Sequence, residues 1–330
     1  MILICFGTRP EWLKIKPLVA LMQRGEYQLL FTGQHPDLLR EAEVDYRISM
    51  TESSNRLDQL VSDCMLQFPE GPFKAVLVQG DTASAFGCAL AAYHRKLRIL
   101  YLEAGLRTFD LDHPYPEEGY RQMIARISYM NFAPTERSRE NLLEEEVLGG
   151  VVITGNTSLD NLREWKDRCA YEKIVLVTLH RRENHRIMEH WFREVNKIAK
   201  IYSDYRFILP IHPNPNVTKH EHLLTDVVVT DPMSHEQLLL TLSKASVVIT
   251  DSGGIQEEAA YLNKQVIVCR HATERPEGIA SGHTRMCAHP NWLESIFHGT
   301  IKRPEINEPC PYGDGYAAEK VYQVIKQCVK

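Results

Sequence analysis

The sequence predicts an α/β protein made of two doubly wound, Rossmann-like domains that face each other across a cleft. Its length of 330 residues corresponds to about two domains of ordinary size. Short apolar runs alternate with longer amphipathic stretches from end to end, which indicates βα units and parallel sheets. One segment, VVITDSGGIQEE at residues 247–258, joins a strand, a glycine turn and a helix start.

Each predicted strand is a short apolar or β-branched run. In the first half these runs are Ile2–Phe6, Gln28–Thr32, Ala75–Gln79, Ile99–Leu102, Asn131–Ala133 and Val151–Ile153. In the second half they are Ile174–Thr178, Arg206–Leu209, Val227–Thr230, Val247–Thr250 and Gln265–Cys269.

Amphipathic patterns between the strands predict helices, for example over Arg121–Met130 and Ile187–Tyr202. Tyr316–Val329 has the pattern of a last helix. The charged segment Leu159–Lys173 is expected to hold the hinge, so we divide the chain into domains of residues 1–162 and 163–330.

Composition and charge exclude several classes of protein. The chain is 44% hydrophobic and 25% charged, as in ordinary globular proteins. Its formal net charge of −5 provides no basic field for nucleic acid, so an anionic ligand must be held by local arginine and lysine. No apolar run approaches the roughly 20 residues that a membrane span needs. The start, MILICFGTRPEW, lacks the features of a signal peptide.

The cysteines lie at positions 5, 64, 88, 169, 269, 287, 310 and 328 and show no CxxC spacing. Several lie inside apolar runs, where cysteine acts as a small core residue. We therefore expect a protein of a reducing, cytoplasmic compartment without a structural zinc site.

The segment after the strand Val247–Thr250 is typical of an anion site. Asp251 and Ser252 can cap a helix that is expected to begin at Ile255. The N–H groups at such a helix start and the positive end of the helix dipole favour a phosphate. The alternative is an ordinary capped turn between a strand and a helix.

The same segment also carries residues suited to a nucleotide. Gly253 and Gly254 let a ligand approach the backbone closely. Glu257 and Glu258 lie in the first turn of the helix, where a carboxylate is stabilised and can accept hydrogen bonds from a sugar diol. The segment therefore indicates a nucleotide held by its phosphates and by its ribose.

Polar residues also follow other predicted strands, where ligands bind in sheets of this kind. They are Arg9 and Lys14 in the first loop, Asp81, Glu103, His180 and His212. Because they follow so many strand ends, we expect them to converge on one cleft as a shared active site.

Each of the basic residues has a structural alternative. Arg9 suits a diphosphate, which arginine binds in bidentate fashion, but also fits a surface position. Arg275 fits a structural ion pair with Glu277. His180 fits a phosphate donor or an acid, or less well a zinc ligand with His185, and His212 fits a ligand or a structural loop residue equally.

The acidic residues are Asp81, Glu103 and Glu117, in predicted loops of the first half, and Glu117 shares a helix face with Arg121 at i, i+4 spacing. Carboxylates that are brought together raise one another's pKa, which gives one protonated acid and one ionised base. Removal of a proton from carbon and its return to the opposite face require such a pair. The alternative is that these acids cap helices and orient arginine.

Taken in order, the motifs resemble those of the non-hydrolysing UDP-N-acetylglucosamine 2-epimerases. They are GTRPEWLKIKPL, TGQH, VQGDT, EAGLRT, PEEGYR, FAPT, TGNTSLD, HRREN, HPNP, DSGGIQEEA, TERPEG and YGDGYA, and they run from Gly7 to Ala317. The resemblance implies a fold like that of B-type glycosyltransferases, with the helix over residues 316–329 crossing back to the first domain. It also implies a homodimer that interconverts UDP-N-acetylglucosamine and UDP-N-acetylmannosamine without NAD or metal.

The family's functional positions fall on matching residues of this chain. Arg9 and Lys14 match the arginine and lysine of the family's first loop. Asp81, Glu103, Glu117 and Arg121 match its catalytic cluster, and His180 matches the histidine of its HRRE motif. Ser252, Gly254 and Glu258 match its phosphate and ribose ligands, and Arg275 matches the arginine of TERPE.

Some positions depart from the family pattern. Tyr101-Leu102 stands where the family usually has His-Val, and Tyr120 replaces the asparagine of PEExNR. Met233 and Leu238 stand where a glutamine and an aromatic residue often contact the uracil. These departures concern the sugar specificity and the uracil contacts, so a 6-deoxy-L-hexosamine or a diacetamido uronate on UDP is an alternative substrate.

Other activities remain open on the sequence. A B-type glycosyltransferase, a hydrolysing epimerase and a non-catalytic nucleotide-sugar sensor would each share the nucleotide loop. Many bacterial members of the family are activated by substrate at a second site, to which the QH loop contributes. Gln34 and His35 keep that loop but Pro36 follows, and SMTESSNRLDQL departs from the usual pattern, so we expect hyperbolic kinetics.

Overall fold

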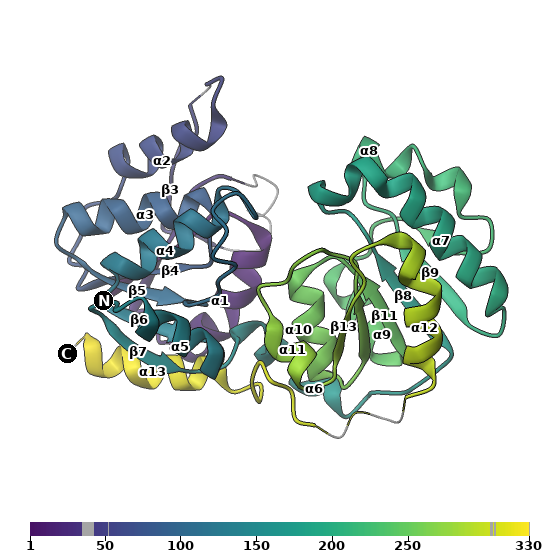
Figure 1. Cartoon of the computed structure of the whole chain (residues 1–330). Coiled ribbons are helices and arrows are strands. Elements are labelled where there is room, and N and C mark those ends of the chain that lie inside the picture. The colour runs from purple at the N-terminus through teal and green to yellow at the C-terminus, as the bar shows by residue number, and fades with distance from the viewer. Residues whose placement is uncertain (35–42, 52, 304–305, 307, 330) are drawn as a thin grey trace. The chain divides into compact units, whose positions relative to one another are not determined.

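In a computed structural model the chain forms two compact units (Figure 1). Unit 1 comprises Met1–Asn161 and Gly313–Lys330, and unit 2 comprises Leu162–Tyr312. The structure describes residues 1–34, 43–51, 53–303, 306 and 308–329. His35 and Pro36, on which the expectation about the QH loop rests, lie outside these residues.

Unit 1 contains a parallel sheet of order β3-β2-β1-β4-β5-β6-β7. Its strands are β1 (Ile2–Phe6), β2 (Tyr27–Phe31), β3 (Tyr46–Arg47), β4 (Ala75–Gln79), β5 (Arg98–Leu102), β6 (Met130–Ala133) and β7 (Gly150–Ile153). Its helices are α1 (Arg9–Leu21), α2 (Arg56–Leu66), α3 (Ala83–His94), α4 (Glu117–Ile127), α5 (Glu136–Glu144), the 3₁₀ helix η2 (Thr157–Leu162) and α13 (Ala317–Cys328).

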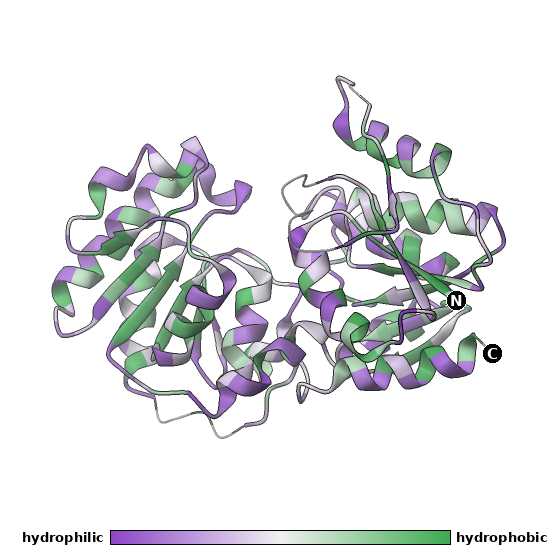
Figure 2. Cartoon of the chain, turned by 180° about the vertical axis from the view of Figure 1, so that it is seen from behind, coloured by the Kyte–Doolittle hydropathy of each residue, from purple (hydrophilic) through white to green (hydrophobic). Residues whose placement is uncertain are grey.

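The strands of unit 1 alternate their side chains between two apolar cores. Leu3 and Cys5 of β1 pack with α2, α3 and α4, whereas Ile2, Ile4 and Phe6 pack with α1 and α13. The sheet is therefore covered by helices on both faces, and Figure 2 shows its strands as mainly hydrophobic. Both faces being buried explains why the strands read as continuous apolar runs.

Helix α13 returns to unit 1 from the end of unit 2 and packs beside α1 (Figure 1). Its apolar stripe includes Ala318, Val321 and Ile325, which belong to the same core as the first strand. Asp160 of η2 accepts hydrogen bonds from the N–H groups of Ala317 and Ala318 at 3.1 and 2.9 Å. A carboxylate from another part of unit 1 thus caps the N-terminus of this helix.

Unit 2 contains a second parallel sheet, of order β10-β9-β8-β11-β12-β13. Its strands are β8 (Ile174–Thr178), β9 (Arg206–Pro210), β10 (Val228–Thr230), β11 (Val247–Thr250), β12 (Gln265–Val268) and β13 (Thr284–Met286). Its α-helices are α6 (Arg163–Lys166), α7 (Met188–Ile201), α8 (Pro215–Thr218), α9 (His235–Lys244), α10 (Gly253–Tyr261), α11 (Pro276–Ala280) and α12 (Leu293–Ile301). Its 3₁₀ helices are η3 (Arg182–Ile187), η4 (Glu221–Leu223) and η5 (Pro290–Trp292).

One face of this second sheet packs against α7 and α12. Trp191 and Phe192 of α7 and Phe297 of α12 are fully buried there against Val177 and Ile249 of the strands. In both sheets the strand order reverses beside the first strand of the unit, between β1 and β4 and between β8 and β11. These reversals are the topological switch points at which ligands bind in such sheets.

The predicted class of two parallel α/β sheets is confirmed, and several element boundaries are corrected. The helix expected over Arg121–Met130 begins at Glu117 and ends at Ile127, because Met130 pairs in β6. The helix expected from Ile255 begins at Gly253. The short strands β3 and β13 were not expected at all.

All eight cysteines are free thiols. Across residues 1–34, 43–51, 53–303, 306 and 308–329, no helix combines the length and the apolar character that crossing a membrane requires.

The cap on α13 gives a first prediction. Asp160→Ala removes the acceptor for two N–H groups at the helix start, and loss of a cap costs on the order of 1 kcal/mol. We expect the amides of residues 317–328 to exchange with deuterium about fivefold faster, as measured by mass spectrometry. Asp160→Asn keeps one acceptor oxygen, so its exchange rate should lie between those of the wild type and Asp160→Ala. Exchange in Asp160→Ala at the wild-type rate would show that α13 does not depend on this cap.

Candidate functional site

The loop between β1 and α1, which the sequence suggested as a diphosphate site, is already filled by a carboxylate of the chain. Oε2 of Glu11 accepts the N–H groups of Gly7 and Thr8 at 2.9 and 2.7 Å and the Thr8 hydroxyl at 2.8 Å. The Thr8 side chain in turn accepts the N–H of Glu11, which completes a capping box. The amides of this loop therefore donate to Glu11, and the side chain of Arg9 beside them is exposed.

Glu11 also joins this loop to the next strand end. Its Oε1 accepts the hydroxyl of Thr82 at 2.6 Å, and Thr82 caps α3 directly after Asp81. Glu11 is 2% exposed, and burial raises the pKa of its carboxyl while these hydrogen bonds lower it in part. The carboxylate thus fixes the turn that carries Asp81.

Gly7 is required by the close approach of two side chains. A Cβ atom at this position would lie 2.1 Å from Oγ1 of Thr32 and 2.2 Å from Oγ of Ser84. These two hydroxyls are themselves hydrogen-bonded at 2.6 Å. Only glycine lets the loop after β1 lie this close to its neighbours.

Glu103, directly after β5, is held by side chains from three elements. Its Oε1 pairs with the ammonium of Lys14 on α1 and accepts Nδ2 of Asn156 at 3.2 Å, and its Oε2 accepts Nε2 of Gln79. Its backbone lies at φ 62°, a left-handed conformation that costs a residue with a side chain about 1 kcal/mol or more. The contacts to Lys14 and Gln79 explain why the strained conformation persists.

Asp81 is oriented by an arginine. Its Oδ2 accepts Nε of Arg121 at 2.8 Å and lies 2.5 Å from Nη2. Arg121 is 5% exposed and also donates to Oε2 of Glu118 at 3.3 Å. The Asp81 side chain keeps partial exposure, so its carboxylate is held in place and still accessible.

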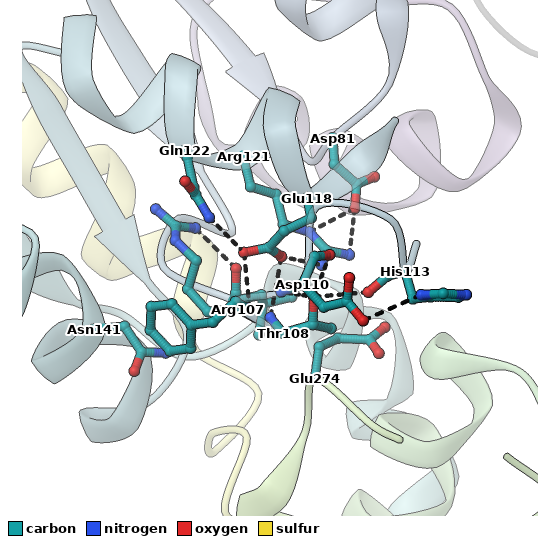
Figure 3. Close-up of polar contacts among 12 residues, drawn as sticks. Asp81, Arg107, Thr108, Asp110, His113, Glu118, Arg121, Gln122, Asn141 and Glu274 are labelled. Carbon is teal, nitrogen blue, oxygen red and sulfur yellow. Dashed lines mark hydrogen bonds and ion pairs between the residues drawn. The ribbon is translucent and has the colours of Figure 1, made fainter. Parts of the chain in front are cut away.

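Glu118 is a structural residue beside this pair (Figure 3). It is fully buried and accepts the N–H groups of Thr108 and Phe109 at 3.0 and 3.2 Å and Nε2 of Gln122 at 2.9 Å. It therefore anchors the loop that follows Glu103 to the start of α4.

The neighbours of Glu118 in the PEEGYR motif occupy different positions. Glu117 is the first residue of α4 and is half-buried. Tyr120, which departs from the family pattern, stacks on Phe86 with ring centroids 4.8 Å apart and planes at 12°. Tyr120 thus packs against α3 at the edge of the apolar core.

In unit 2 a second buried carboxylate joins two strand ends. Asp251 follows β11, is fully buried, and accepts the N–H groups of His180 and Arg181 through Oδ2 at 2.9 Å each. Asn184 donates to the same oxygen at 3.0 Å. Asp251 therefore fixes the HRREN segment, and the prediction that it caps α10 is wrong.

His180 lies in a stack with His212, which follows the neighbouring strand β9. The ring centroids are 5.2 Å apart and the planes are inclined by 10°. Burial lowers the pKa of His180, the carboxylate of Asp251 raises it, and the charge of His212 lowers it again. His185 donates from Nε2 to the carbonyl of His180 at 3.0 Å.

The start of α10 differs from the start of α1. In the described part of the chain no side chain caps α10, and Ser252 does not cap it although it is the N-cap residue. A Cβ at Gly254 would meet no atom within 4 Å. The N–H groups at this helix start are therefore not taken up by a side-chain cap from the described residues.

Arg275 lies against this glycine turn. A Cβ at Gly253 would be 2.5 Å from Nη1 of Arg275, so a side chain at this position would displace the guanidinium. Arg275 donates from Nε to Oε1 of Glu257 at 2.6 Å and also pairs with Glu274. Its carboxylate partners therefore include Glu257 and Glu274. The ion pair with Glu277 that the sequence suggested stays a prediction.

Glu258, the next residue of α10, has a different partner from Glu257. Its Oε1 lies 3.2 Å from Nε2 of His235, the first residue of α9. Glu258 is 9% exposed. Of the two adjacent glutamates, Glu257 pairs with an arginine and Glu258 with a histidine.

The structure thus places the predicted residues in two groups. In unit 1 the side chains of Lys14 and Glu103 meet, as do those of Asp81 and Arg121, and Glu117 begins the same helix as Arg121. In unit 2 the predicted residues are at the carboxyl ends of β8, β9 and β11, in α10 and directly before α11, namely His180, His212, Ser252, Gly253, Gly254, Glu258 and Arg275.

Several residues that position these groups were missed by sequence reasoning. Glu11 could have been found, because Thr8 and Glu11 have the T-x-x-E spacing of a capping box. Asn156, Gln79 and His235 carry no such local signal. Among the residues the structure describes, no group of three or more His, Cys, Asp or Glu side chains is arranged to hold a metal ion.

Comparison with known proteins agrees with this arrangement. A family model described as UDP-N-acetylglucosamine 2-epimerase matches residues 20–326. The chain belongs to this family. A UDP-N-acetylglucosamine 2-epimerase from Neisseria meningitidis is 33% identical to it over 367 aligned positions, which cover 98% of each protein.

Solved structures of the epimerase family show the same fold. The crystal structure of the UDP-GlcNAc 2-epimerase from Neisseria meningitidis bound to UDP-GlcNAc matches with a TM-score of 0.88 and 31% identity, over 99% of both chains. The co-structure of S. aureus MnaA with UDP matches with a TM-score of 0.87 and 30% identity, over 99% of this chain and 96% of that one. These matches confirm the predicted family and the predicted pair of Rossmann-like domains.

The buried position of Glu11 gives a second prediction. Glu11→Ala leaves buried N–H and hydroxyl donors without an acceptor, which costs roughly 2–4 kcal/mol of unfolding free energy. Glu11→Gln keeps one acceptor oxygen and should lose less. Urea denaturation measures both variants against Glu136→Ala, an exposed glutamate in the first turn of α5. If Glu11→Ala unfolds at the same urea concentration as Glu136→Ala, the loop does not depend on this carboxylate.

Proposed function

We propose that this protein is a non-hydrolysing 2-epimerase that interconverts UDP-N-acetylglucosamine and UDP-N-acetylmannosamine. The observation that carries the proposal is that one chain of the UDP-N-acetylglucosamine 2-epimerase family contains both a helix start without a side-chain cap from the described residues, in unit 2, and a set of hydrogen-bonded acids, in unit 1. The relative from Neisseria meningitidis whose structure contains UDP-GlcNAc supports the choice of substrate.

The nucleotide part of the substrate is assigned to unit 2. The N–H groups of Gly253 and Gly254 at the uncapped start of α10 suit the diphosphate, since they stabilise negative charge without a counter-ion. His180 stands at the neighbouring strand end and is suited to donate to the same group. Arg275, which Glu257 and Glu274 hold against the glycine turn, is suited to stabilise the same diphosphate.

The sugar chemistry is assigned to the acids of unit 1. One of Asp81, Glu103 and Glu117 removes the proton from C2 while the bond between C1 and the phosphate oxygen breaks. The products of this step are UDP and a 2-acetamidoglucal. A second acid then returns a proton to the opposite face of C2, and the UDP oxygen adds back to C1.

The C2 proton is not acidic, so stabilisation of the leaving diphosphate must carry much of the barrier. Donors that are already oriented toward the developing charge need no reorganisation during the reaction. The hydrogen bonds to Glu103 and Asp81 also fix the positions of these acids before the reaction. General acid–base groups act best when they are held within hydrogen-bond reach of the proton. Exclusion of water keeps the glucal from being trapped.

The remaining attributes of the proposal come from the family resemblance and the composition. We infer a homodimer that needs neither NAD nor a metal ion and that acts in the cytoplasm. The free cysteines are compatible with a reducing compartment.

The third prediction tests the reaction type. The protein is incubated with UDP-N-acetylglucosamine in D₂O and the sugar is followed by NMR. We expect deuterium at C2 of both epimers with UDP still attached. Free N-acetylmannosamine would indicate a hydrolysing epimerase, and a sugar without deuterium would indicate a transferase or a sensor. A panel of UDP-2-acetamido sugars in the same assay identifies the preferred substrate.

A matched pair of variants ties the exchange to the acids. Glu103→Gln should lower the rate of deuterium incorporation by at least about 10²-fold, the usual scale for loss of a general acid or base. Glu140→Gln changes an exposed glutamate of α5 and should keep the wild-type rate. Glu103→Gln with normal folding and near-normal exchange would contradict the assignment of Glu103.

A further inference from the structure

His235 is placed rigidly at the start of α9. The preceding residue, Ser234, caps the helix by accepting the N–H of Gln237 at 3.2 Å. The side chain of Gln237 accepts the N–H of Ser234 at 2.9 Å, which completes a capping box. The backbone of His235 is therefore fixed by both bonds, and its ring projects from the first position of the helix.

The ring of His235 reaches a carboxylate on the next helix. Nε2 of His235 lies 3.2 Å from Oε1 of Glu258, which belongs to α10. An ionised carboxylate only accepts hydrogen bonds, so the proton of this bond lies on Nε2. Within the described residues, Oε2 of Glu258 accepts no hydrogen bond, while the side chain as a whole is largely buried.

The neighbouring carboxylate shows what this arrangement achieves. Glu257 forms an ion pair with the guanidinium of Arg275. This ion pair is part of the structure of the glycine turn. The imidazole of His235 holds Glu258 by a single hydrogen bond to Oε1. Oε2 of Glu258 is thereby left as an acceptor for further hydroxyl donors.

We propose that His235 is a positioning residue for the nucleotide. By occupying Oε1, it fixes the Glu258 carboxylate so that Oε2 accepts hydrogen bonds from the ribose diol of UDP. This inference rests on the proposed function, in which Glu258 binds the ribose. His235 lies in none of the sequence motifs, and no spacing pattern indicated it.

Calorimetry with UDP tests this role directly. His235→Ala should weaken UDP binding about fivefold, the scale of one lost hydrogen bond that orders a charged acceptor. His235→Gln places an amide nitrogen close to the position of Nε2 and should bind UDP nearly as the wild type does. Glu236→Ala changes an exposed residue in the same helical turn and serves as the control for helix α9.

A second nucleotide separates positioning from packing. With 2′,3′-dideoxyuridine 5′-diphosphate the ribose has no diol, so wild type and His235→Ala should bind it equally. Equal UDP affinity of wild type and His235→Ala would overturn the inference, and so would the same fivefold weakening with the dideoxy nucleotide.

Glu258→Ala distinguishes this inference from the proposal beneath it. If Glu258→Ala weakens UDP and His235→Ala does not, only the role of His235 fails. If Glu258→Ala leaves UDP affinity unchanged, the assignment of the ribose to Glu258 fails, and the inference about His235 fails with it.

Discussion

A buried carboxylate at each switch point holds the loops on which the candidate site is built. In unit 1, Glu11 binds the N–H groups after β1 and the hydroxyl of Thr82 after β4. In unit 2, Asp251 follows β11 and binds the N–H groups of His180 and Arg181 after β8. In both sheets the bridged strands are the neighbours between which the strand order reverses. Such a bridge removes the freedom that two adjacent loops would otherwise have, so the residues beside it are presented in one geometry.

The two carboxylates, Glu11 and Asp251, act differently on the helix starts beside them. Glu11 occupies the helix start after β1, so an external anion would have to displace a buried, hydrogen-bonded group. Asp251 lies beside the start of α10 but accepts from His180, Arg181 and Asn184, and among the described residues no side chain caps that helix. This difference is why the proposal assigns the acids to unit 1 and the diphosphate to unit 2. The ion pair of Lys14 with Glu103 acts in a similar way, since it holds the Glu103 carboxylate in one position.

Sequence reasoning found what depends on local pattern. The strands were recognisable because both faces of each sheet are buried, and Ile2–Phe6 and Val247–Thr250 match the prediction residue for residue. The strand β13 was missed because three residues, Thr284–Met286, give no readable period. Helix α4 was placed too late because Glu117 starts it without a side-chain cap.

The partners within the site depend on packing that no local pattern records. Glu103 is bonded by Asn156, which lies 53 positions away in the chain, and Asp81 by Arg121, which lies 40 away. The sequence predicted that Glu103 and Asp81 are acids that follow strands. It could not predict which side chains they contact. Glu257 and Glu258 are adjacent and alike in sequence, yet one faces Arg275 and the other His235.

Amide hydrogen exchange of the wild-type protein, followed by NMR, tests the central claim that the buried carboxylates fix the switch-point loops. The informative amides are those of Gly7, Thr8, His180 and Arg181, which lie outside the strands but donate to Glu11 or Asp251. We predict that they exchange as slowly as the amides of the strands that precede them, because opening them would break a buried bond to a carboxylate. Exchange at the rate of an open surface loop would contradict this account.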